Sequence, residues 1–226
     1  MTRDGCSLGR RTAFQIREQV DRGRRLDRAL ESCVQGIEAR ERAFAHELAY
    51  GVTRLRGRID HLLSRHVHRG VDALDPNLRE VLRLATYQLF YMHSVPDYAA
   101  VSEAVAHARS LVGKGAAGLA NAVLRRLAEA GADREEFPDL ESDPAGFLTT
   151  WGSHPRWLID RWLKRWGPQK VFELVETNNT RSLACLTPLR ARAEEALESL
   201  RMAGLDGEPV GYGTECVRLD RSSSPV

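Results

Sequence analysis

Apolar residues recur at helical spacing over residues 75–130, and this stretch predicts three consecutive helices that form most of one core. Asp75 is a suitable N-cap for the first helix, and Pro76 follows at the first helical position, where its missing N–H is not needed. Pro96 separates the first helix from the second, and the glycine-rich loop 113–118 separates the second from the third. The apolar faces are Leu78, Val81, Leu82, Leu84, Ala85 and Leu89; Ala100, Val101, Ala104, Val105 and Ala108; and Leu119, Val123, Leu124 and Leu127.

Further helices are expected upstream of this stretch. A basic helix is predicted over 8–20, a second over 26–34 and a third over 39–55, and helical character continues from Ile59 toward Gly70. With the three helices above, they give a helical domain over residues 1–131.

The remaining residues, 132–226, are expected to hold a linker and a second domain. Residues 132–150 are acidic and rich in helix breakers, which predicts a linker. Residues 151–226 then begin with connector helices, the first of which Gly167-Pro168 ends. A helical pattern over 191–203 and a short strand over 216–219 predict a small α/β segment. The fold class is therefore mainly α: a helical bundle, a helical connector and a small, incomplete α/β segment.

The composition fits a folded cytoplasmic protein. With 226 residues, of which 42% are hydrophobic, the chain can bury a core. It has no apolar run of about 18 residues that would span a membrane, and its N-terminus lacks the apolar stretch of a secretory signal. The four cysteines are far apart and form no C-x-x-C pair, so reduced thiols are expected.

Charge is distributed unevenly along the chain. The net charge is +2, but residues 1–131 hold 21 basic against 15 acidic residues, and residues 132–226 hold 12 against 16. Of the 33 basic residues, 30 are arginine, whose planar donors suit phosphate and base stacking better than those of lysine. A genome rich in G+C also favours arginine, but it does not account for the difference between the two halves.

Three runs in the first part of the chain carry a family resemblance. The run VLRLATYQLFYMHSVPDYAAVSEAV (81–105), followed by LANAVLRRL (119–127), resembles the NusB fold. In particular it is similar to the NusB-like N-terminal domain of bacterial 16S rRNA 5-methylcytosine methyltransferases (RsmB/Sun type). The run ARERAFAHELAYGVTRLRGRIDHLL (39–63) resembles this methyltransferase branch more than free-standing NusB.

The resemblance continues downstream and then departs from the family. The run SHPRWLIDRWLKRWG (153–167) and the later NN resemble the connector into the second RNA-binding domain of the methyltransferases. The family continues with Arg-Pro-Pro and an extended strand, whereas here only Arg181 is kept before SLACLTPLR. The departure falls on the first strand of the α/β segment.

The resemblance implies where RNA binds. The arginine-rich first helix lies on the RNA face of NusB-type proteins, so Arg10, Arg11 and Arg17 are candidate contacts to phosphate or sugar. The loop that contains Lys114 lies near RNA in the same proteins, and a lysine at a helix N-terminus is suited to bind phosphate. A solvated helix face and a flexible loop are the alternatives for these two segments. The tryptophans at 151–166 fit base stacking, but packing in the core is favoured.

Catalytic and metal sites are not expected. His61, His66 and His68 are close in sequence, but no cysteine or further histidine nearby completes the four ligands of a structural zinc site. In the family, S-adenosylmethionine bound by a Rossmann-type sheet and a cysteine nucleophile carry out the reaction. No glycine-rich turn after a strand and no Pro-Cys context occur here. We therefore expect the chain to lack the catalytic domain, to bind no cofactor itself and to be inactive alone.

The sequence therefore predicts the RNA-binding, non-catalytic region of the methyltransferase, with 16S rRNA as partner and a catalytic domain in the same or a separate chain. One alternative is a stand-alone NusB-type transcription antitermination factor, which would bind a ribosomal protein and a linear RNA signal. A second is a truncated remnant of the methyltransferase. A third is a helical module that binds only protein.

Overall fold

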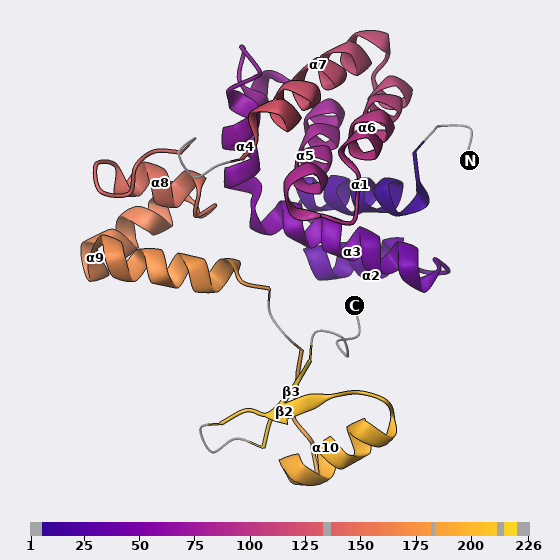
Figure 1. Ribbon diagram of the computed structural model, residues 1–226, viewed down its shortest axis with the longest axis vertical. Helices are drawn as coiled ribbons and strands as arrows, with labels where there is room; N and C mark the ends of the chain where they lie inside the picture. Colours follow the sequence, from indigo (N-terminus) through magenta and orange to yellow (C-terminus); the bar gives the residue numbers. More distant parts are fainter. Residues whose placement is uncertain (1–5, 133–136, 182–183, 212–214, 221–226) are drawn as a thin grey trace. The chain divides into compact units, whose positions relative to one another are not determined.

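Helices dominate the first of the two compact units into which the chain folds (Figure 1). The computed structural model describes residues 6–132, 137–181, 184–211 and 215–220. The first unit is Met1–Asn179 and the second is Thr180–Val226. The elements of the first unit are α1 (Leu8–Asp21), α2 (Leu26–Cys33), α3 (Ala39–Arg54), α4 (Arg56–Ser64), the 3-10 helix η1 (Val71–Ala73), α5 (Pro76–Tyr91), α6 (Asp97–Leu111), α7 (Lys114–Ala130), α8 (Pro144–Thr150) and α9 (Arg156–Asn179).

Helix α5 lies in the middle of the bundle and packs against α1, α3, α4, α6 and α7 (Figure 1). Its predicted start is confirmed, because the Asp75 carboxylate accepts hydrogen bonds from the backbone N–H groups of Asn77 at 2.9 Å and Leu78 at 3.2 Å. Pro76 is the first helical residue. A helix surrounded on so many sides has little exposed surface, and four of its polar side chains are buried: Glu80, Arg83, Thr86 and Gln88.

A buried ionic network, which consists of Arg17, Asp60, Glu80 and Arg83, joins α1, α4 and α5. Arg17 Nε donates to Glu80 Oε1 at 2.8 Å, and Arg83 bonds to both Asp60 oxygens at 2.7 and 2.9 Å. The Arg83 side chain also pairs with Glu80 at 3.3 Å. Burial alone would lower the pKa of Arg83, but its hydrogen bonds and charge interactions with Asp60 and Glu80 outweigh that effect and raise the pKa. Two cations and two anions thus satisfy one another, with three of the side chains buried and Asp60 29% exposed at the edge of the core.

The connection between α6 and α7 is shorter than the sequence predicts. Helix α7 begins at Lys114, so the two glycines at 115 and 118 lie inside the helix and not in a loop. Gly113 alone breaks the helix here, with a φ of +124° that L side chains rarely adopt. The alanines around the two helical glycines have the highest helix propensity, which offsets the cost of glycine.

The segment predicted as an acidic linker contains a helix that contributes to the core. The Asp143 carboxylate accepts from the Gly146 N–H at 2.9 Å and begins α8, with Pro144 at its first position. Phe147 and Leu148 of this helix are 1% and 0% exposed. The breaker-rich composition thus includes a helix-capping signal as well as loop. The boundaries at 131 and 150 stay predictions, and the compact units themselves divide after Asn179.

Arg58 joins α4 to the turn between α8 and α9. Its backbone N–H donates to Ser153 Oγ at 2.8 Å, its Nε donates to the carbonyl of Trp151 at 2.8 Å, and its guanidinium lies 3.8 Å from the centre of the Trp151 ring. The preceding Gly57 allows this approach, because a Cβ there would lie 2.7 Å from the Thr149 carbonyl oxygen. We call these contacts the Arg58 clamp. They hold the α8–α9 pair against the bundle.

Two further sequence predictions can be compared with the structure. Gly167 breaks α9 with a φ of +77°, as the Gly167-Pro168 pair predicts.

The second unit forms a small antiparallel sheet with strand order β1-β3-β2 and one helix. Helix α10 and strand β3 lie where a helix and a strand are predicted, whereas β2 is not predicted. Strand β1 is only two residues long, at the point where the sequence departs from the family. The elements are β1 (Cys185–Leu186), α10 (Ala193–Met202), β2 (Gly207–Pro209) and β3 (Val217–Leu219).

We expect Gly51→Ala to destabilise the protein by about 1–3 kcal/mol. Gly51 lies in α3, and a Cβ there would overlap the ring of Tyr87. This ring is 2% exposed and its hydroxyl donates to Glu47 at 2.7 Å, so it has no room to move. The control is Gly118→Ala in α7, where a Cβ meets nothing within 4 Å; it should stabilise by about 0.5–1 kcal/mol. Thermal unfolding followed by circular dichroism separates the two, and equal shifts would contradict the prediction.

Arg83→Met should destabilise the protein by about 3–5 kcal/mol, because it removes a fully buried cation shared by Asp60 and Glu80 and leaves the buried Glu80 with Arg17 alone. Arg22→Met is the matched control, since Arg22 is 72% exposed and pairs with Glu18 at 2.8 Å. Loss of that surface pair should change the free energy of unfolding by less than about 1 kcal/mol. A small effect of Arg83→Met in urea titration would show that the network is dispensable.

Candidate nucleic-acid interface

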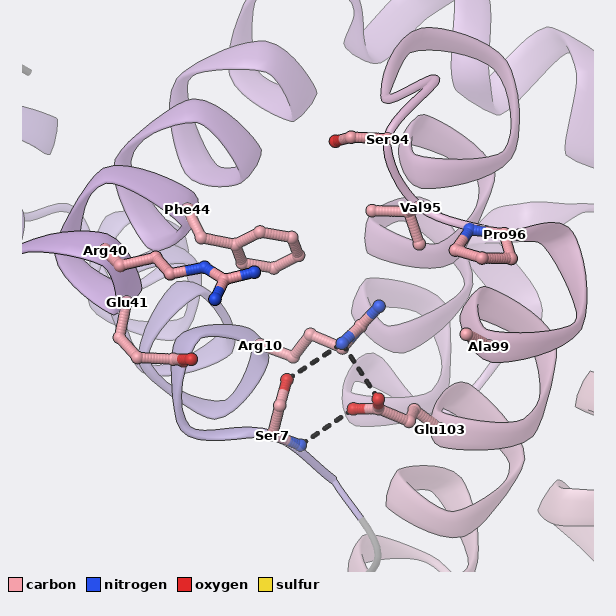
Figure 2. A pocket seen from close by; sticks show the side chains of 10 residues that line it. All are labelled: Ser7, Arg10, Arg40, Glu41, Phe44, Ser94, Val95, Pro96, Ala99 and Glu103. Carbon is pink, nitrogen blue, oxygen red and sulfur yellow. Dashed lines mark hydrogen bonds and ion pairs between the residues drawn. The ribbon is translucent and has the colours of Figure 1, made fainter.

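A pocket of about 440 Å³ opens where the first turns of α1 and α3 meet the connection between α5 and α6. Figure 2 shows Arg10 of α1 and Arg40 of α3 extending into this pocket from different helices, with Phe44 beside them. The pocket brings together three segments that are distant in sequence. Its lining residues are Ser7, Arg10, Arg40, Glu41, Phe44, Ser94, Val95, Pro96, Ala99 and Glu103.

Arg10, a predicted RNA contact, is held firmly within the protein. Its Nη1 pairs with Glu103 Oε1 at 2.9 Å and donates to Ser7 Oγ at 2.9 Å (Figure 2). Its Nε donates to Gln88 Oε1. Its guanidinium also lies 5.1 Å from the centre of the Phe44 ring. The side chain is 12% exposed. Arg10 therefore presents a small, fixed part of its guanidinium to the pocket.

Acidic side chains occupy the N-terminal end of α1. The backbone N–H of Ser7 donates to Glu103 Oε2 at 2.8 Å, and that of Gly9 donates to Glu41 Oε2 at 2.5 Å. Free N–H groups at the start of a helix usually attract anions. Here these two carboxylates fill that role, so a phosphate in the pocket would have to be bound by side chains. The two arginines and two glutamates of the lining also cancel in formal charge.

Arg40 is the cation that sequence reasoning missed. It is exposed, and the described residues include no hydrogen bond or ion pair to it. The sequence places it in a run of surface arginines along one helix, which gives no reason to single it out. Its role depends on the packing of α1 against α3, which helical periodicity alone does not reveal.

The other predicted contacts lie elsewhere. Arg11 is half-buried and does not line the pocket. Arg17 corrects a prediction, since its side chain is 1% exposed and belongs to the buried ionic network. Its guanidinium also donates to Thr53 Oγ1 at 3.0 Å. A cation this deep in the core stabilises the fold and is not available to RNA at the surface.

Lys114 lies far from the pocket. It is exposed and is the first residue of α7, with no acidic residue in the first turn. The pocket residue Pro96 precedes α6 and Lys114 follows it. At 1.5 Å per residue, the 15 residues of α6 span about 22 Å. The structure therefore supplies two separate cationic positions and not one cluster.

His61, near the end of α4, has a packing role. The His61 ring stacks on Phe137 with 4.8 Å between the ring centres. Burial and the nearby charge of Arg65 lower the pKa of both His61 and His66. Within the described residues, no group of three or more His, Cys, Asp or Glu side chains is arranged to hold a metal ion. No helix in the described part of the chain is long and apolar enough to cross a membrane.

Comparison with known proteins finds two domain families that match successive parts of the chain. Residues 8–129 match the NusB family, and residues 154–226 match the RsmF/B-like methyltransferase, ferredoxin-like domain. The relative "Ribosomal RNA small subunit methyltransferase B" of Pseudomonas syringae pv. tomato is 31% identical over 196 residues, which cover 86% of this chain and 42% of the relative. The chain thus spans less than half the length of that protein.

Solved structures share the fold. The NusB structure from T. maritima covers 58% of this chain and 97% of its own, with a TM-score of 0.51 and 24% identity. The structure of PH0851 covers 97% of this chain and 49% of its own, with a TM-score of 0.64 and 17% identity. The helical bundle has the first fold, and nearly the whole chain follows the second. The chain therefore belongs to the NusB family and continues into the ferredoxin-like domain of RsmF/B-like methyltransferases.

Proposed function

We propose that this chain is the RNA-binding, non-catalytic region of a 16S rRNA 5-methylcytosine methyltransferase, which docks ribosomal RNA in the cytoplasm. The order of the two matched domains and the similarity to the rRNA methyltransferase of P. syringae support this role. The structural observation that carries it is the exposed guanidinium of Arg40 beside the fixed guanidinium of Arg10 in the NusB-type bundle.

In this proposal, RNA is bound through its backbone. Arg40 and Lys114 contact phosphates about one helix length apart, while Arg10 orients the pocket. Contacts to phosphate fix the position of an RNA without reading its sequence, so specificity comes from the shape of the folded rRNA. Arg17 acts through the core and makes no contact with RNA.

In this proposal the methyl donor is bound by a domain outside the described residues. In this family S-adenosylmethionine supplies the methyl group and is bound by a Rossmann-type sheet. The described sheet is antiparallel and its strands have two or three residues, so these residues do not fit the cofactor. A catalytic domain, in the same chain or supplied separately, would act on the RNA that this region holds.

Helices α8 and α9 favour the methyltransferase region over a stand-alone antitermination factor. They lie beyond the residues that match the NusB family, yet Phe147, Leu148 and the Arg58 clamp attach them to the bundle. A free-standing NusB protein covers only 58% of this chain. A docking region of a larger enzyme needs such a connection between the bundle and the second domain, whereas a stand-alone antitermination factor does not.

Arg40→Ala should weaken binding to a 16S rRNA fragment and reduce the slope of log affinity against log salt by about 1, because one phosphate contact is lost. Fluorescence anisotropy at several salt concentrations measures both quantities. Arg28→Ala is the control, because Arg28 is 68% exposed on α2 but pairs with Glu31 at 3.0 Å. An unchanged slope for Arg40→Ala would contradict the proposal.

Lys114→Ala should weaken binding to the same fragment by a similar factor. The loss should be additive with that of Arg40→Ala, because the two side chains are well separated and share no partner. Binding free energies of the two single variants and the double variant test this. Wild-type affinity for Lys114→Ala would remove this residue from the interface.

A further inference from the structure

Helix α9 exposes the large aromatic side chain of Trp157. Its relative exposure is 67%, whereas Trp151 and Trp162 pack against the core of the first unit. Trp166 is 41% exposed and lies under the guanidinium of Arg165, 5.4 Å from its ring centre. Within the described residues, no ring or cation contacts the face of Trp157. The fold gains little from this tryptophan, since an indole stabilises a protein mainly when it is buried.

Unpaired cations share the exposed side of α9 with Trp157. Arg161 and Lys164 follow it by four and seven residues, so the three side chains lie along one helix face. Both cations are exposed, and neither forms an ion pair with any described residue. By helical rise they lie about 6 and 10 Å along the axis from Trp157. We call Trp157, Arg161 and Lys164 the tryptophan face.

The surrounding charge is mostly positive. Residues 156–170 contain five basic residues and one acidic residue, Asp160. The single carboxylate pairs with Arg156 at 2.9 Å and leaves the tryptophan face uncompensated. An uncharged protein surface packed on this face would bury two unpaired cations, which is costly. A polyanion with flat aromatic groups satisfies both the cations and the indole.

We propose that the tryptophan face binds an unpaired nucleotide of RNA, with the base stacked on Trp157 and the flanking phosphates paired with Arg161 and Lys164. The inference rests on the proposed function in taking RNA as the ligand, and it adds a second mode of contact. The pocket between α1 and α3 holds the backbone of structured RNA, whereas α9 selects a strand whose bases are free to stack. Docking would therefore require an unpaired segment next to a folded one.

The experiment measures binding of the full chain to a fluorescein-labelled oligouridylate of about 12 nucleotides, and to an RNA hairpin without unpaired overhangs. Trp157→Leu should lower affinity for the oligouridylate on the order of tenfold, whereas Trp157→Phe, which keeps an aromatic face, should retain most of it. Hairpin affinity should not change in either variant. Quenching of tryptophan fluorescence by unlabelled oligouridylate should occur in the wild type and disappear in Trp157→Leu.

Charge variants complete the test. Arg161→Gln with Lys164→Gln should reduce the salt slope for oligouridylate, whereas Arg28→Gln on α2 should not. Equal oligouridylate affinity for wild type and Trp157→Leu would overturn the inference, and so would binding of Trp157 to a separately expressed catalytic domain with RNA affinity unchanged. The proposed function is tested separately, because Arg40→Ala acts on the hairpin. Loss of hairpin binding there, with no effect of Trp157→Leu on oligouridylate, would reject the tryptophan face alone.

Discussion

The buried ionic network of Arg17, Asp60, Glu80 and Arg83 is the constraint on which the bundle depends. Side chains from α1, α4 and α5 meet there with little access to water. Charges of this kind are tolerated in a core only in matched sets with good geometry, so the three helices must pack in one arrangement. Arg17 of the network also donates to Thr53 Oγ1 of α3 at 3.0 Å, so the same side chain links α1 to α3, whose first turns line the pocket of Arg10 and Arg40.

Much of the fold could be predicted from the sequence because its signals are local. Asp75-Pro76, Pro96 and Gly167-Pro168 mark helix ends through capping or backbone chemistry, and the structure has helix boundaries at each. The failures lie where local signals compete. Alanines keep α7 helical through two glycines, and the acidic segment contains the cap of α8 at Asp143.

The candidate site was less predictable, since charge alone does not say whether an arginine is free. Arg10, Arg17 and Arg40 read alike in sequence. Tertiary pairing distinguishes them: Glu80 holds Arg17 in the core, Glu103 fixes Arg10 at the edge of the pocket, and Arg40 remains open to solvent. The tryptophans divide in the same way. The prediction of core packing is correct for Trp151 and Trp162, but Trp157 lies on the surface.

The Arg58 clamp has a consequence for how this architecture tolerates change in chain length. Arg58 fixes the α8–α9 turn through Ser153 and Trp151, and Phe137, which lies between α7 and α8, is 7% exposed and contacts the rings of His61 and Trp151. A gain or loss of residues between Phe137 and Asp143 would therefore shift one of these two anchors relative to the other.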